Sequence, residues 1–147
     1  MDWSDGPTGA LSYVALKLVG YGVWGYVGLR WLSPGYPTPV RKALVLGALR
    51  LVLGWVTGIL VGPFVLVTGA RGISVFYFSG LAIVRFVEWS IIGALLPPSG
   101  ASATDRGFLG GGGRGLLWRV GGIIVSYLAD LPFLIAEGGL PHGRILC

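Results

Sequence analysis

The sequence predicts an all-α membrane protein with four transmembrane helices, with three helices as the main alternative. Hydrophobic residues make up 54% of the 147 residues and charged residues only 12%, about half the charged share of a typical soluble domain. Four apolar stretches are each long enough to cross a hydrocarbon core of about 30 Å, which needs ~20 helical residues. We therefore expect a single polytopic membrane domain over residues 1–147.

The first three spans are defined by the breakers between them. The first covers about 10–32 and ends before three prolines in 34–39, which cannot continue a helix. The second covers about 40–68, and a short turn containing glycine leads to the third, at about 73–96. The proline pair at 97–98 ends the third span.

The fourth span covers about 116–140 and follows a polar, glycine-rich loop at 97–115. Pro132 lies inside this span, where a proline removes a backbone hydrogen bond and kinks a helix. Glu137 and the glycine pair at 138–139 also weaken it. These residues are the reason for the three-span alternative.

The distribution of basic residues predicts the orientation. Short loops on the cytoplasmic or matrix side carry an excess of Lys and Arg, and both larger loops have this excess, so both termini should face the outer side. A bacterial cytoplasmic membrane and a mitochondrial inner membrane fit equally well. We expect structural lipids, with Lys17 reaching the headgroup layer and four further bases contacting headgroups: Arg30, Arg41, Lys42 and Arg119.

Charged residues inside the spans are the most informative feature, because an unpaired charge in hydrocarbon is costly. A rise of ~1.5 Å per residue places Arg50 and Glu88 about 10–12 Å from the positive side. The same arithmetic places Arg85 and Asp130 about 16–20 Å deep. We expect one ion-pair cluster of zero net charge that joins the last three spans. It can fix helix packing, relay protons or ions, or pair with a partner subunit.

Glycines form two smooth helix faces on which another helix can pack closely. One face is on the second span and the other is on the first. Their packing partner is either another span of this chain or a helix of another protein. The residues are Gly47, Gly54, Gly58 and Gly62 on the second span, and Gly22, Gly25 and Gly28 on the first.

Several functions are not expected from this residue content. One Cys and one His, His142, cannot form a metal centre within the chain, and no His lies in a span to bind haem. The glycines at 110–113 lack the ending of a phosphate-binding loop. The net charge of +5 comes from bases flanking apolar runs, which favours membrane orientation over nucleic-acid binding. We expect no catalytic residues, no metal, no cofactor and no enzymatic activity.

The sequence therefore favours a non-catalytic accessory subunit of a larger membrane complex, with other membrane subunits and lipids as its partners. Energy-converting complexes (respiratory, ATP synthase or photosynthetic) are a common setting for small, glycine-rich chains of this kind. The alternative is a small homo-oligomeric transporter or channel that uses Arg85, Glu88 and Asp130. An assembly factor that associates only transiently is a third reading.

Overall fold

Four helices make up the described part of the chain, which in this computed structural model is residues 7–69, 75–96 and 112–136. The all-helical class and the four helices are confirmed, and no strand occurs within these ranges. The helices are α1 (Pro7–Leu32), α2 (Pro39–Gly69), α3 (Val75–Ala94) and α4 (Gly112–Ala136).

The helix ends follow local chemistry. Pro39 stands at the first position of α2, where its missing N–H costs nothing. After α1, the amide of Ser33 donates to the carbonyl of Leu29, and Gly35 takes a positive φ of 89° that completes the turn. The main boundary difference from the sequence prediction is at α4, which begins at Gly112, inside the expected loop. Residues 97–111 and 137–140 lie outside the described residues.

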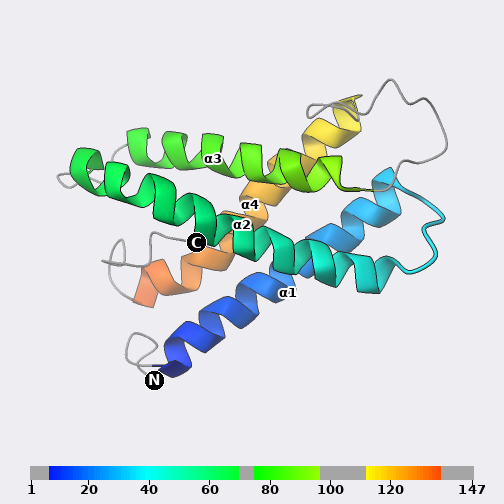
Figure 1. Ribbon diagram of the computed structural model, residues 1–147, viewed down its shortest axis with the longest axis horizontal. Coiled ribbons are helices and arrows are strands. Elements are labelled where there is room, and N and C mark those ends of the chain that lie inside the picture. The colour runs from blue at the N-terminus through cyan, green and yellow to red at the C-terminus, as the bar shows by residue number, and fades with distance from the viewer. Residues whose placement is uncertain (1–6, 70–74, 97–111, 137–147) are drawn as a thin grey trace.

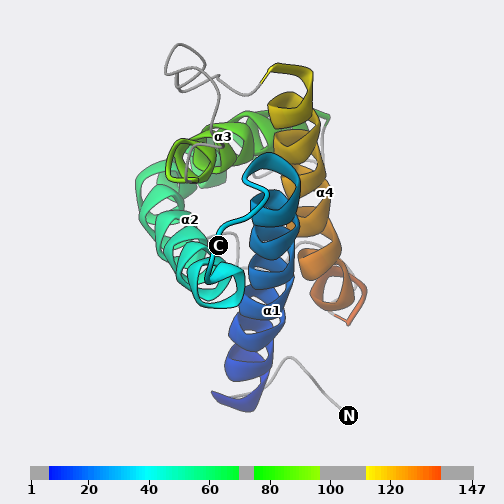
Figure 2. The same ribbon diagram turned by 90° about the vertical axis from the view of Figure 1, so that its right-hand side faces the viewer.

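The helices form two antiparallel pairs that cross at an angle (Figure 1). One pair is α1 with α4, and the other is α2 with α3; α1 also packs on α2, and α3 on α4. Each helix therefore packs mainly against two others around a shared interior, as an end-on view shows (Figure 2). The end of α1, the start of α2, the end of α3 and the start of α4 lie at one end of the molecule.

Glycine allows α1 and α2 to cross at very short range. A Cβ atom on Gly47 would lie 2.8 Å from the backbone nitrogen of Gly22 and 3.0 Å from its Cα. A Cβ on Gly25 would lie 3.3 Å from the carbonyl oxygen of Ala43. This part of the predicted glycine faces therefore packs within the chain. Gly54 is buried and Gly58 half-buried, while the surroundings of Gly62 lie outside the described residues.

Three tryptophan rings each pack against a glycine of another helix. Trp24 of α1 covers Gly121, Trp118 of α4 covers Gly28, and a Cβ on Gly122 would meet the Trp89 ring at 2.5 Å. The indole N–H of Trp24 donates to the Trp118 carbonyl at 2.9 Å, and the Trp118 indole donates back to the Trp24 carbonyl at 3.2 Å. These contacts fix α4 against α1 without leaving either indole N–H unsatisfied.

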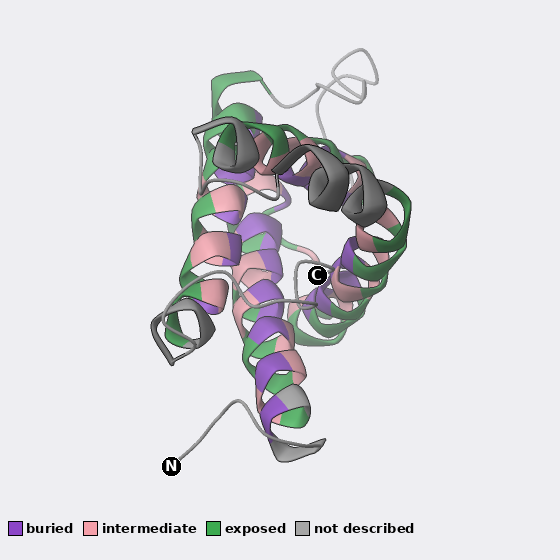
Figure 3. Ribbon diagram, turned by 90° about the vertical axis from the view of Figure 1, so that its left-hand side faces the viewer, coloured by how far each residue is buried: buried purple, intermediate pink, exposed green. Residues whose placement is uncertain are grey.

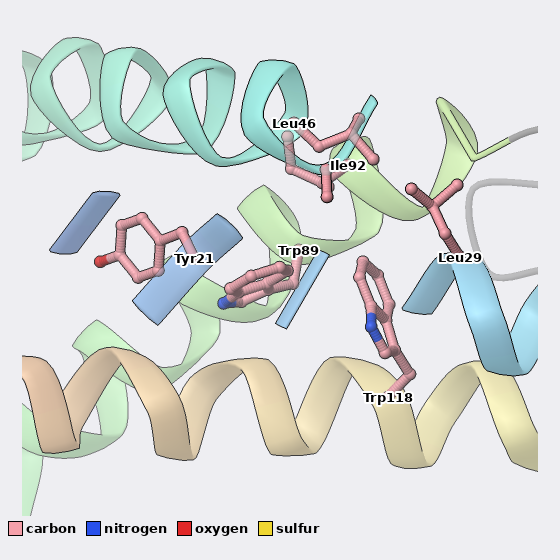
Figure 4. Packing of buried hydrophobic residues seen from close by; sticks show 7 residues of the cluster. Tyr21, Leu29, Leu46, Trp89, Ile92 and Trp118 are labelled. Atoms are coloured by element: carbon pink, nitrogen blue, oxygen red, sulfur yellow. The ribbon is translucent and has the colours of Figure 1, made fainter. Parts of the chain in front are cut away.

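The core consists of buried aromatic and aliphatic side chains near the crossing (Figure 4). Trp89 meets both Tyr21 and Trp118 edge to face, with ring centroids 5.8 Å and 5.2 Å apart, which is a favoured aromatic arrangement. Leu29, Leu46 and Ile92 complete its centre.

The outer surface is strongly apolar. Buried residues face the shared interior and exposed residues face outward along the helices (Figure 3). Large hydrophobic side chains are exposed on all four helices, among them Leu11, Val52, Ile83 and Leu128. This is the reverse of the pattern expected for an amphipathic helix in water.

One helical stretch in the described residues, Pro39–Leu60 of α2, is long and apolar enough to cross a membrane, and only 28% of its most apolar window is buried in the chain. Membrane association is thus weakly indicated, and four transmembrane helices are not confirmed. Charges, tyrosines and glycines reduce the mean hydropathy of α1 and α4. In α3 the described side chains begin only at Ser79, which leaves a stretch too short to cross a membrane.

The helix crossing predicts a sharp difference between two glycines. Gly47→Ala should destabilise the fold by about 1–3 kcal/mol, because its new methyl group meets backbone that cannot move aside without separating the helices. Gly80→Ala is the matched control: it is exposed, with nothing within 4 Å of a new Cβ, so alanine should be neutral or stabilise by up to about 1 kcal/mol. Unfolding in mixed micelles would measure both, and equal effects would contradict the crossing.

A buried ion-pair network as the candidate functional site

Five charged side chains from all four helices meet inside the molecule. Lys17 comes from α1, Arg50 from α2, Arg85 and Glu88 from α3, and Asp130 from α4. The first four are at most 3% exposed as residues, and the Asp130 side chain is 17% exposed. Charged groups are rarely this buried unless they are paired.

Asp130 is the acceptor for three side chains. Its Oδ2 atom receives a hydrogen bond from Nη2 of Arg85 at 2.6 Å. Its Oδ1 atom lies 2.8 Å from Nζ of Lys17 and accepts a hydrogen bond of 2.9 Å from the Tyr13 hydroxyl. Asp130 therefore connects α4 to α3 and to α1, and both of its oxygens have donors.

Glu88 connects α3 to α2. Its Oε2 atom lies 2.5 Å from Nη2 of Arg50, and its Oε1 atom accepts a hydrogen bond from the Thr57 hydroxyl. Thr57 lies two turns after Arg50 on the same helix face. One carboxylate thus contacts two side chains of a single neighbouring helix, which holds α2 and α3 in one register.

Aromatic rings complete the surroundings of the cations. The Arg50 guanidinium lies over the rings of Tyr21 and Trp89, with centroid distances of 4.9 Å and 5.5 Å. Arg85 lies 5.3 Å from the Tyr127 ring centroid, and the Lys17 ammonium lies 4.3 Å from that of Tyr13. Cation–π attraction is strongest in such desolvated positions.

The structure brings together the four charged residues singled out from the sequence, in the two pairs that the depth estimate favoured: Arg50 with Glu88 and Arg85 with Asp130. Their role stays a prediction. The four charges sum to zero as counted from the sequence, but Lys17 also contacts Asp130, and the five groups sum to one positive charge when all are ionised.

Two of the bases expected to reach headgroups are buried in the structure. Lys17 is fully buried on Asp130 rather than extended to the membrane surface. Arg119 is only 4% exposed, and its guanidinium packs close to Gly93 of α3. Arg30 and Arg41 are exposed and Lys42 is half-buried, so these three remain open to headgroups.

The α1 contribution carries a sequence signal that the depth estimate omitted. Tyr13, Lys17 and Tyr21 recur at every fourth position and so lie on one helix face. Counted from Leu32, Lys17 lies about 22 Å deep, close to the depth of Asp130. Applying the same arithmetic to α1 would have placed Lys17 beside that carboxylate.

The site consists of cations, carboxylates, hydroxyls and aromatic rings. Within the parts of the chain that the structure describes, no three His, Cys, Asp or Glu side chains lie together as a metal site would require.

No family model matches this sequence, and comparisons with curated proteins and with solved structures gave no match.

Neutralising Glu88 tests whether the network supports the fold. Glu88→Gln should destabilise the protein by about 3–5 kcal/mol, because it leaves Arg50 buried without its counter-charge. The double variant Arg50→Met with Glu88→Leu should recover most of that loss, since well-packed apolar residues can replace a buried pair. The helical content of the detergent-solubilised protein, followed as denaturant is added, would measure the stability of both variants. A double variant as unstable as Glu88→Gln would argue against an ion pair as the cause.

Proposed function

We propose that this chain is a non-catalytic accessory subunit of a larger integral-membrane complex, held in the bilayer by four transmembrane helices. The observation that carries the proposal is the inverted distribution of side chains. Charged residues in the middle of the helices are paired in the interior, while large apolar side chains are exposed on the outside of all four helices. Such a surface suits lipid tails and the apolar faces of other membrane subunits.

The placement of the bases supports four spans with the predicted orientation. Arg30, Arg41 and Arg114 are exposed, and they belong to the end of α1, the start of α2 and the start of α4, which share one end of the molecule (Figure 1). A cluster of bases at one end of a helical unit marks the cytoplasmic or matrix side. Anionic lipid headgroups are the natural structural ligands at this end.

The paired interior supports a structural role over catalysis. Asp130 contacts donors from α1 and α3, and Glu88 contacts donors from α2. The oxygens of both carboxylates are therefore occupied by neighbouring side chains. The same contacts connect all four helices, so the charges account for packing without a reaction.

An exposed tryptophan in the middle of α2 supports a protein partner. Trp55 is 49% exposed and stands about 20 Å from either end of the helix. Tryptophan on a lipid-facing surface usually lies at the membrane–water interface, which Trp55 is too deep to reach. Val52, Val56 and Ile59 surround it and are also exposed. An aromatic residue within an apolar patch is a common anchor of protein interfaces.

Replacement of Trp55 tests the proposed interface. Trp55→Leu keeps the surface apolar but removes the anchor, so it should reduce co-purification of unlike subunits on the order of tenfold. Trp31→Leu is the control. Trp31 is similarly exposed, but it lies at the end of α1, where the membrane–water interface is predicted.

Native mass spectrometry after mild detergent extraction would measure both variants against the unmodified chain. Unlike subunits in fixed ratio, lost only in Trp55→Leu, are the expected result. A homo-oligomer of this chain alone, unchanged by either substitution, would contradict the accessory role and favour a transporter or channel.

A further inference from the structure

Arg30 of α1 carries a guanidinium whose position is fixed by a neighbouring tyrosine. Its Nε atom donates a hydrogen bond of 3.0 Å to the hydroxyl of Tyr26, about one turn earlier on the same helix face. The guanidinium also lies 5.4 Å from the centroid of the Tyr26 ring, and that ring packs against the buried core. A side chain that is already held in place loses less conformational freedom when it binds a ligand.

The outer part of this guanidinium remains free to bind an anion. Arg30 is exposed, and its hydrogen bond to Tyr26 uses only the Nε atom. The ion pairs among the described residues involve other cations, which are Lys17, Arg50 and Arg85. The terminal nitrogens of Arg30 therefore present a fork that matches two oxygens of a phosphate group.

A strip of outward-facing residues continues from Arg30 toward the middle of α1. Val19, Val23, Tyr26 and Arg30 follow one another at intervals of three or four residues, so they share one helix face. The two valines are 62% and 58% exposed. Val19 lies about 16 Å deeper than Arg30 along the helix, close to half of a hydrocarbon core of ~30 Å. This surface, named here the Arg30–Val19 strip, therefore has the length of one lipid leaflet.

We infer that the Arg30–Val19 strip binds one anionic phospholipid of the cytoplasmic or matrix leaflet, with its phosphate on Arg30 and an acyl chain along Val23 and Val19. The phosphate complements the guanidinium fork in charge and geometry. A zwitterionic headgroup would bring its own cation close to Arg30, so an anionic headgroup is favoured. The inference rests on the proposed position of the chain in a bilayer, but not on the presence of partner subunits.

Native mass spectrometry of the full-length protein in mild detergent, with any subunits that accompany it, tests this inference. Dimyristoyl phosphatidylglycerol should bind saturably and about fivefold more tightly than dimyristoyl phosphatidylcholine, the effect expected of one base beside an anionic headgroup. Equal affinities for the two lipids would overturn the inference. Inorganic phosphate that binds as tightly as phosphatidylglycerol would also overturn it, because the apolar part of the strip would then contribute nothing.

Extraction of the chain separates this inference from the proposed function. A chain that is recovered in buffer without detergent would contradict the membrane position, and both proposals would fail. A chain that needs detergent but shows no preference for phosphatidylglycerol would leave the proposed function standing and overturn the lipid site alone.

Substitutions at Arg30 and Tyr26 locate the lipid. Arg30→Lys keeps the charge but removes the fork and the bond to Tyr26, so the Kd for phosphatidylglycerol should rise about tenfold. Tyr26→Phe keeps the ring but releases the guanidinium, and should raise the Kd about fivefold, the equivalent of one hydrogen bond. Tyr36→Phe is the matched control and should leave the Kd unchanged, because Tyr36 is also half-buried against the core but lies outside the strip. Since Arg30 is exposed and its replacement should not unfold the protein, an unchanged Kd in Arg30→Lys would overturn the assignment to the strip.

Discussion

The fold depends on two interior carboxylates, Glu88 and Asp130, that take their hydrogen-bond donors from other helices. Asp130 obtains its donors from α1 and α3, and Glu88 obtains its donors from α2. Removing one partner from a buried pair leaves an unmatched charge, which costs more than the pair contributes. Sliding any helix by one turn would remove at least one of these contacts. The charges therefore specify helix register more strongly than they add stability.

The glycine and tryptophan contacts are what bring those side chains within reach. Lys17 and Asp130 can meet only because α1 and α4 lie close together, with Trp24 over Gly121 and Trp118 over Gly28. Apolar packing of this kind tolerates small displacements, whereas the ion pairs do not. Packing determines which helices are neighbours, and the ion pairs select one arrangement among the packings that apolar surfaces would permit.

Sequence reasoning predicted much of this arrangement for physical reasons that can be named. Apolar runs and prolines placed four helices, and a constant rise per residue paired Arg50 with Glu88 and Arg85 with Asp130. The place of Lys17 was missed because its nearness to a span end suggested headgroup contact. The Trp–Gly contacts join residues more than thirty positions apart, so no local pattern reveals them. Hydropathy alone also does not establish four membrane spans, since polar interior positions lower it in α1 and α4.

The order of the four helices along the chain has a consequence for biogenesis. A ribosome synthesises Lys17 and Arg85 well before the carboxylate that both of them contact. Until α4 emerges, these two cations have no share of that carboxylate, and α1 and α3 lack the connection that it provides. Before that point the two cations need water or other partners, because an unpaired charge in an apolar interior is costly. Synthesis of α4 is therefore the step that allows α1, α3 and α4 to be joined through Asp130.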